Sequence, residues 1–206
     1  MTTTQQDDSG TVFLIDDDPA VRDSLTLLLS LKGMSTQPFA TADSFIETYQ
    51  PDRSGCVLTD LRMPGMTGLE LQSALAERGI DVPLVVLTAH GDVATARAAL
   101  KNGAFDFLEK PVDDTMLVEV LRNALRVDRE RRAATSSRST ADARLARLTA
   151  REREILALLA SGHQNREIAA QLGISPRTVE VHKARIMEKL ECHSLAELIR
   201  MNLASG

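Results

Sequence analysis

Cysteine and aromatic residues are scarce in this chain. Its 206 residues include two cysteines, no tryptophan, one tyrosine and five phenylalanines. Cys56 and Cys192 lie far apart and lack the close spacing of metal ligands, so the sequence argues against a disulfide framework and against a zinc site. This cysteine usage is typical of a reducing cytoplasm, where we expect the protein to be located.

Long apolar runs are also missing. No run approaches the roughly 20 residues that a membrane-spanning helix needs. Residues 1–10 are polar and acidic, without the apolar core of a signal peptide. We therefore expect a protein without a membrane partner, whose residues 1–10 form a disordered N-terminus.

Charge is distributed unevenly along a chain that is long enough for two domains. Residues 1–127 hold 10 Lys and Arg against 19 Asp and Glu, residues 128–147 hold 6 against 3, and residues 148–206 hold 8 against 7. The three segments therefore carry net charges of −9, +3 and +1. This asymmetry places any nucleic-acid contact in the second half of the chain.

Five strand-then-helix units account for residues 11–127. Short apolar runs suited to buried strands occur at 11–15, 56–59, 84–88 and 104–108, and 34–38 is a weaker strand candidate. Each is followed by a segment with helical periodicity, at 19–32, 43–49, 69–78, 93–102 and 115–127. This alternation predicts an α/β domain with a five-stranded, doubly wound parallel sheet.

Residues 128–147 form a predicted linker of helical or flexible character. Residues 128–132 alternate in charge, as is typical of an exposed helix. Residues 134–140, Ala-Thr-Ser-Ser-Arg-Ser-Thr, have no apolar periodicity and indicate a flexible segment. The sequence leaves open whether 127–147 is one stiff helix or a hinge.

Residues 148–206 predict a separate all-helical domain. Thr149 and Glu152 fit a capping box at the start of a helix. A helix near 166–172 meets Gly173, and Ser175 and Pro176 then begin another helix that runs to about residue 191. Helix, short glycine-containing turn and helix form the helix-turn-helix pattern, here expected within a four-helix domain.

Reactive side chains follow four of the predicted strands. Asp16 and Asp17, Asp60, Thr88 and Lys110 would meet at the carboxyl edge of a parallel sheet, where ligands bind. Asp17 and Asp60 offer the paired carboxylates that Mg²⁺ prefers. Asp60 can act as a nucleophile toward a phosphoryl group, while the Lys110 cation and the Thr88 hydroxyl bind the phosphoryl oxygens.

These motifs resemble the receiver domain of two-component response regulators over residues 11–127. The resemblance rests on Ile15-Asp16-Asp17-Asp18, Thr59-Asp60, Met63-Pro64-Gly65, Thr88-Ala89 and Lys110-Pro111. It implies that Asp60 is the phosphoacceptor. It also implies that Mg²⁺ or Mn²⁺ is bound directly by Asp17 and Asp60, through water by Asp16, and by the backbone carbonyl of Arg62.

The same resemblance assigns a switch to the other strand ends. It implies that Thr88, Ala89 and Lys110 hold the phosphoryl group, that Phe107 changes rotamer with Thr88, and that the Lys110–Pro111 peptide is cis. Phe107 could instead be an ordinary core residue. Asp18 could be a metal ligand or simply an acid at a helix start.

A phosphohydrolase with an aspartate nucleophile is the alternative from another class. Haloacid-dehalogenase-type enzymes place a second aspartate two residues after the nucleophile as general acid/base. Arg62 occupies that position in this chain. We therefore expect a slow switch and not an enzyme.

The helix after Ser175 predicts a surface suited to the DNA major groove. On a helical wheel Val179, Ile186 and Leu190 share one face, and His182 at its edge is interpreted as structural. The predicted DNA-binding residues are Arg177, Thr178, Glu180, Val181, Lys183, Ala184, Arg185 and Lys189. Arginine typically contacts phosphate or guanine, glutamate accepts from cytosine, and valine or alanine meets the thymine methyl group. Lys183 and Lys189 are predicted phosphate contacts.

Residues 148–206 resemble the LuxR-type DNA-binding domain, so the whole chain looks like a FixJ-type member of the NarL/FixJ class. The motifs are Leu148 to Glu152, Asn165 to Ala169, Ser175 to His182 and Ser194 to Leu198. The resemblance implies transcription activation, with a sensor histidine kinase, promoter DNA and RNA polymerase as partners and a homodimer formed on phosphorylation. RNA binding is disfavoured because residues 148–206 contain no aromatic side chain that bases could stack on.

Overall fold

The computed structural model describes residues 10–89, 93–194 and 197–198. The chain divides into two compact units, residues 1–132 and 133–206. The disordered segment predicted for residues 1–10 lies, apart from residue 10, outside the described residues.

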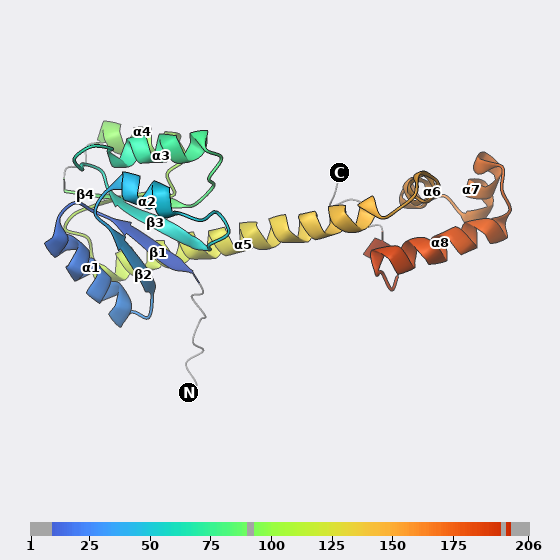
Figure 1. The fold of residues 1–206 in the computed structure, drawn as a ribbon, viewed down its shortest axis with the longest axis horizontal. Coiled ribbons are helices and arrows are strands. Elements are labelled where there is room, and N and C mark those ends of the chain that lie inside the picture. Colours follow the sequence, from blue (N-terminus) through green and yellow to red (C-terminus); the bar gives the residue numbers. More distant parts are fainter. Residues whose placement is uncertain (1–9, 90–92, 195–196, 199–206) are drawn as a thin grey trace. The chain divides into compact units, whose positions relative to one another are not determined.

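The first unit contains a five-stranded parallel sheet, as predicted (Figure 1). Its strands run in the order β2-β1-β3-β4-β5. They are β1 (Thr11–Ile15), β2 (Ser35–Phe39), β3 (Gly55–Asp60), β4 (Leu84–Thr88) and β5 (Asp106–Glu109). β1, β3 and β4 form the buried centre of the sheet, which explains their near-continuous apolar sequences.

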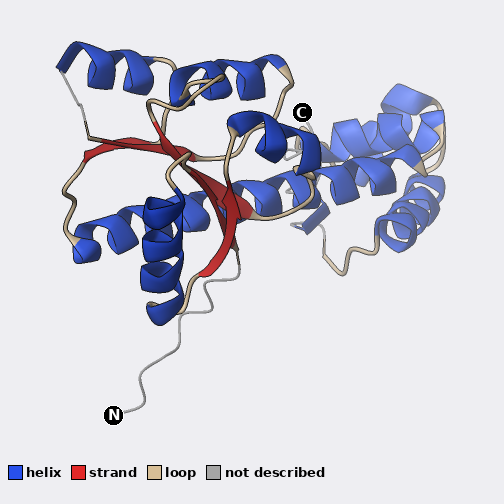
Figure 2. Ribbon diagram, turned by 60° about the vertical axis from the view of Figure 1, so that its left-hand side comes forward, coloured by secondary structure: helices blue, strands red, loops and turns tan. Residues whose placement is uncertain are grey.

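Helices cover both faces of this sheet (Figure 2). α2 (Ala42–Thr48), α3 (Gly68–Glu77) and α4 (Val93–Lys101) lie on one face, and α1 (Pro19–Leu31) and α5 (Asp114–Ala146) on the other. A hydrophobic core lies on each face of the sheet, and successive strand residues point into one core and then the other. Phe13 packs toward α2 and α3, and Leu14 packs toward α1 and α5. The sheet is therefore doubly wound, and its strands all end at one edge.

Helix α5 corrects the prediction of a flexible linker at residues 134–140. These residues are helical, as part of α5, although every residue from 133 to 140 is exposed. Apolar packing therefore does not explain their conformation. Ion pairs tie down the flanking turns: Asp128 binds Arg132 at 2.7 Å in the first unit, and Arg144 binds Glu191 at 2.7 Å in the second.

The second unit contains a helix-turn-helix, as predicted. Its helices are α6 (Ala150–Ala160), α7 (Asn165–Leu172) and α8 (Pro176–Leu190). Thr149 and Glu152 form the predicted capping box. Gly173 ends α7 with a left-handed φ of 65°, and the Ser175 hydroxyl caps α8 by accepting from the Thr178 N–H at 3.1 Å. Most of the fourth helix expected after Ser194 lies outside the described residues.

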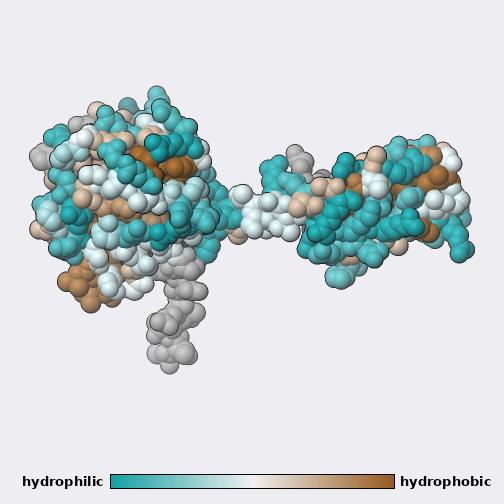
Figure 3. Space-filling model, viewed as in Figure 1, coloured by the Kyte–Doolittle hydropathy of each residue, from teal (hydrophilic) through white to brown (hydrophobic). Residues whose placement is uncertain are grey.

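The face of the molecule shown in Figure 3 carries mostly hydrophilic residues, including those over α8. Within the described ranges, none of the helices has both the length and the apolar character needed to cross a lipid bilayer.

Candidate functional site

The carboxyl edge of the sheet brings together three of the predicted site residues. Lys110 directs its ammonium between two carboxylates, with Nζ 3.0 Å from Asp16 Oδ2 and 2.8 Å from Asp60 Oδ2. Asp16 is only 3% exposed, whereas Asp60 at the end of β3 is partly accessible. The second oxygen of Asp60, Oδ1, accepts from the Arg62 N–H at 3.0 Å. The Asp60 carboxylate is therefore held by one cation and one backbone donor.

The charge state of Lys110 follows from this geometry. Partial burial acts to lower the pKa of its ammonium, but the hydrogen bonds that it donates to Asp60 and Asp16, and the negative charges of both carboxylates, outweigh that effect. The net result is a raised pKa. Lys110 is thus a permanent cation beside Asp60 at neutral pH.

The remaining predicted residues of this site lie on neighbouring strand ends. Thr88, at the end of β4, is 1% exposed, and its carbonyl accepts from the Lys110 N–H at 2.7 Å. Ala89 follows it at the surface, and Asp17 is exposed at the end of β1. Phe107 on β5 is partly buried against the core on the α2–α4 face. The Lys110–Pro111 peptide is cis, as the resemblance implied.

Asp18 has a structural partner in the same turn. Its carboxylate accepts from the Ala20 N–H at 2.8 Å and caps α1, one of the two roles that the sequence had left open.

Two residues near Asp16 and Asp60 were missed by the sequence analysis. The guanidinium of Arg22 donates to the Asp16 carbonyl at 2.6 Å and so ties α1 to the acidic turn. Gly68 lies so close to β3 that a Cβ there would be 2.5 Å from the Asp60 carbonyl oxygen. The sequence contained a signal for Arg22, because it is a basic residue in the first turns of the helix that follows the acidic end of a strand. It contained no signal for the close packing of Gly68 against β3.

The oxygen donors at this edge fit a small, hard cation. Within the described part of the chain, no cluster of three or more His, Cys, Asp or Glu side chains is arranged to hold a metal ion. A cation here would therefore rely on two carboxylates, a backbone carbonyl and oxygens of water or phosphate. That set is typical of Mg²⁺, which usually takes one or two carboxylates together with phosphate oxygens.

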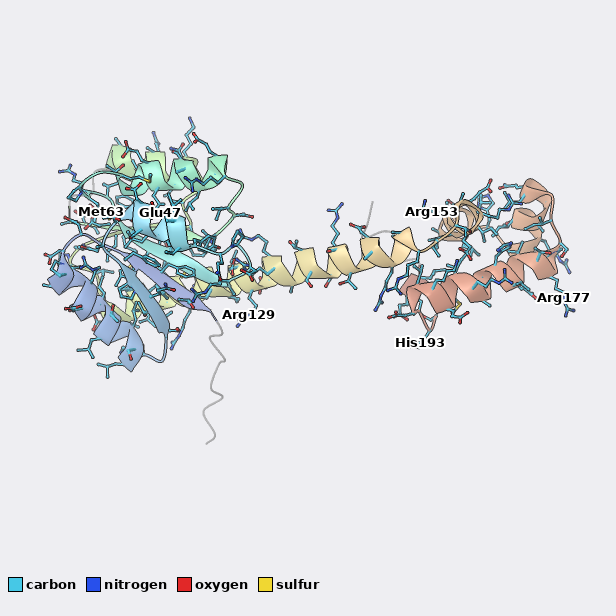
Figure 4. All side chains as sticks on the ribbon, viewed as in Figure 1. Glu47, Met63, Arg129, Arg153, Arg177 and His193 are labelled. Atoms are coloured by element: carbon cyan, nitrogen blue, oxygen red, sulfur yellow. The ribbon has the colours of Figure 1, made fainter. Side chains whose placement is uncertain are left out.

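Helix α8 exposes most of the residues predicted to bind DNA. Arg177, Glu180, Val181 and Ala184 line one surface hollow, in which the apolar side chain of Val181 is 45% exposed. Figure 4 shows the side chain of Arg177 extending away from the N-terminal end of α8.

The other predicted residues of α8 differ in exposure. Arg185 is exposed and Lys183 is partly buried. Thr178 belongs to the N-cap, where its hydroxyl lies 2.8 Å from that of Ser175. His182 is partly buried, and its interpretation as structural stays a prediction.

Lys189, a predicted phosphate contact, forms an ion pair within the second unit and keeps a side-chain exposure of 35%. Its ammonium lies 2.7 Å from Oε2 of Glu152, whose side chain is 4% exposed. The same oxygen accepts from the Thr149 N–H at 2.8 Å. These charge-assisted bonds, with the Lys189 ammonium first among them, lower the pKa of Glu152 to about 2. Lys189 therefore joins α8 to α6.

Comparisons with known proteins give the family of both units. Residues 12–122 match the response regulator receiver domain, and residues 146–202 match the LuxR family of bacterial regulatory proteins. Transcriptional regulatory protein FixJ of Azorhizobium caulinodans is 45% identical over 95% of this chain and 92% of its own length. FixJ of Rhizobium meliloti is 42% identical over 95% and 96%.

Solved structures with the same domain order are also similar. Response regulator StyR superposes with a TM-score of 0.87 at 39% identity, covering 95% of this chain and 98% of its own. Full-length FixJ from B. japonicum gives a TM-score of 0.59 at 38% identity, covering 96% and 97%. A receiver domain implies a sensor kinase as partner, and a LuxR-type domain implies DNA. The chain therefore belongs to the FixJ-like two-component response regulators, transcription regulators that join a receiver domain to a LuxR-type helix-turn-helix domain.

Proposed function

We propose that this protein is a transcription activator switched by phosphorylation of Asp60. A sensor histidine kinase donates the phosphoryl group, and Mg²⁺ or Mn²⁺ is required. The phosphorylated receiver forms a homodimer, and the second unit then binds promoter DNA and recruits RNA polymerase.

One observation carries the proposal: the ammonium of Lys110 lies between Asp60 and the buried Asp16 at the carboxyl edge of the sheet. An oxygen of Asp60 attacks phosphorus, the bond from phosphorus to the donor breaks, and its electron pair leaves with the donor. Lys110 then moves from the carboxylate to a phosphoryl oxygen, and the Thr88 hydroxyl binds another. Asp17, Asp60 and the backbone carbonyl of Arg62 would hold Mg²⁺, which would supply further positive charge to neutralise the phosphoryl oxygens.

Two surfaces support the later steps. We assign the contact with a second copy to the α4–β5–α5 side of the receiver, where Leu100 on α4 and Met116 near the start of α5 are 48% and 52% exposed. Arg177, Glu180 and Val181 on α8 provide groups that can read base edges. Two copies of α8 in a dimer would read two half-sites related by a two-fold axis.

The first experiment is intact-mass spectrometry after incubation with Mg²⁺ and acetyl phosphate. We expect one phosphoryl adduct on the wild type, no adduct on Asp60→Asn, and an adduct on Asp52→Asn, a control at an exposed loop position. The adduct should be lost when EDTA is added before the phosphodonor. Light scattering on the same samples should show a dimer only where the adduct is present.

An adduct that persists in Asp60→Asn would refute the assignment of the phosphoacceptor. A wild-type protein that stays unmodified by both acetyl phosphate and a histidine kinase would refute the switch itself. The second unit would then have to act as a constitutive DNA-binding domain.

A further inference from the structure

A completely buried carboxylate on α5 has no part in the phosphorylation site. Asp128 is 0% exposed and lies near the end of the first unit, six residues beyond the segment that matches the receiver family. Its Oδ2 accepts from the Ser54 hydroxyl at 2.9 Å and from the Gly55 N–H at 3.0 Å. Asp128 therefore attaches α5 to the first residue of β3.

Two arginines of the next turn complete this attachment. Arg131 donates to Asp128 Oδ1 at 2.9 Å, and Arg132 donates to Oδ2 at 2.7 Å. Arg131 also binds Asp81, and Arg132 donates to the Pro51 carbonyl at 2.7 Å. We call Asp128, Arg131 and Arg132, with their partners Ser54 and Gly55, the Asp128 clasp.

Both carboxylate oxygens of Asp128 accept hydrogen bonds, although the charged group is completely buried. Burial acts to raise the pKa of Asp128, but the hydrogen bonds from Arg131, Arg132, Gly55 and Ser54 outweigh it and lower the pKa. A buried carboxylate is tolerated only with such partners. The apolar packing of α5 on the sheet ends at Leu125. Beyond it, the next turn is held to the receiver by the Asp128 clasp and by further bonds of its two arginines, from Arg131 to Asp81 and from Arg132 to Pro51 and Tyr49.

The stretch of α5 that follows has an anchor at each end, the Asp128 clasp in the first unit and the Arg144–Glu191 pair in the second. Residues 133–140 are exposed on every side of the helix and are rich in serine and threonine, which favour a helix less than alanine does. Short helices without tertiary packing are marginal in water. The fixed turn at residues 128–132 therefore supplies the helical start from which 133–140 can continue.

From this arrangement we propose that the Asp128 clasp is the positioning site that couples the receiver to the DNA-binding unit. It fixes the connecting part of α5 to β3, the strand that begins at Gly55 and ends at Asp60. When the clasp is opened, residues 129–140 lose the fixed turn that supports their helical conformation. Phosphorylation of the receiver then no longer alters DNA binding by the second unit. The coupling role rests on the proposed function, whereas the anchoring role can be tested without it.

The test uses full-length Asp128→Ala and Asp128→Asn. Glu130→Gln is the matched control, because Glu130 is an exposed carboxylate two residues away whose partner is the exposed Arg126. Hydrogen exchange followed by mass spectrometry measures peptides from 129–140 and from β3 and β4. The extent of the acetyl phosphate adduct is measured by intact mass. Affinity is measured, with and without phosphodonor, for a DNA duplex that the wild type selects from a random library.

For Asp128→Ala we expect exchange at least tenfold faster in 129–140, wild-type exchange in β3 and β4, and a wild-type adduct. The ratio of DNA affinities with and without phosphorylation should fall toward one. Asp128→Asn should lie between this variant and the wild type, because its amide keeps acceptor capacity and loses the charge. Glu130→Gln should match the wild type throughout.

Three results would overturn the inference. Exchange in 129–140 that stays at the wild-type rate in both variants would show that the Asp128 clasp does not anchor α5. Equal acceleration in β3 and β4 would make Asp128 a general stability residue of the receiver. A wild-type response of DNA affinity with the clasp opened would show that coupling takes another route. An unmodified wild type would instead refute the proposed function, and the exchange data would still decide the anchoring role.

Discussion

Replacing Glu152 with glutamine should selectively weaken the second unit. The variant keeps the size of the side chain and an acceptor for the Thr149 N–H, but it removes the charge that binds Lys189. In the folded protein the pKa of Glu152 falls from 4.5 to about 2. A shift of this size corresponds to about 3 kcal/mol at roughly 1.4 kcal/mol per pKa unit.

The expected loss is smaller than this upper figure. The Lys189 side chain is 35% exposed, so water screens the ion pair and can rehydrate the ammonium after the substitution. A loss of about 2 kcal/mol at pH 7 follows, in the range for hydrogen bonds to charged groups. Because the pKa is lowered on folding, this stabilisation is complete above pH 4.5 and is lost as the pH falls toward 2.

Hydrogen exchange in the full-length protein can isolate this effect. Peptides from α6 and α8 of Glu152→Gln should exchange about 30-fold faster at pH 7, since each 1.4 kcal/mol is a factor of ten. Glu154→Gln is the control, because Glu154 forms an exposed pair with Arg151 and should change exchange by about twofold or less. Carboxyl carbon NMR of ¹³C-glutamate-labelled protein should show one glutamate that titrates near pH 2.

Two results would refute this reasoning. Exchange in Glu152→Gln that matches Glu154→Gln would show that the buried pair contributes no net stability. A set of glutamate titrations that all fall in the ordinary range would show that the hydrogen bonds at Glu152 do not favour its charged form.

The packing of the strand that bears Asp60 and the charges of α8 give two further predictions. Gly68→Ala places a Cβ 2.5 Å from the Asp60 carbonyl oxygen, so denaturation should show a loss of about 1–3 kcal/mol. Acetyl phosphate labelling should also slow, while Ser73→Ala on the same helix leaves both unchanged. For DNA, fluorescence anisotropy over a range of salt should show that Lys183→Ala lowers the salt slope by about 1. Lys189→Ala should leave that slope unchanged and destabilise the second unit.

Much of the proposed phosphorylation site could be predicted from the sequence because its geometry depends on the topology of the sheet. Parallel strands end at one edge, so acids after β1 and β3 and a lysine after β5 had to converge. In agreement with this rule, Lys110 Nζ lies 2.8 Å from Asp60 Oδ2, although the two residues are 50 positions apart in the sequence. The Asp60–Gly68 contact had no such signal, because it depends on the path of a single loop.

Residues 133–140 of α5 show where prediction from the local sequence fails. Serine and threonine without apolar periodicity predict a flexible segment at 134–140, and in isolation that prediction is physically reasonable. The helix there follows from interactions outside the segment, at Asp128 in the first unit and at Arg144 in the second. A sequence window of a few residues contains none of these partners.

Lys183 and Lys189 on α8 also show that the local sequence does not reveal a distant partner within the protein. A helical wheel places both within reach of DNA phosphates and gives no reason to separate them. The buried acceptor that distinguishes them, Glu152, lies 37 residues before Lys189 and on another helix. A capping box predicts that the Glu152 carboxylate turns back to its own N-cap, but only the packing of α6 against α8 brings a lysine to that oxygen. Counting every lysine and arginine on α8 therefore overstates its affinity for DNA. Side chains whose charge is already paired within the protein, such as Lys189, have to be left out of the count.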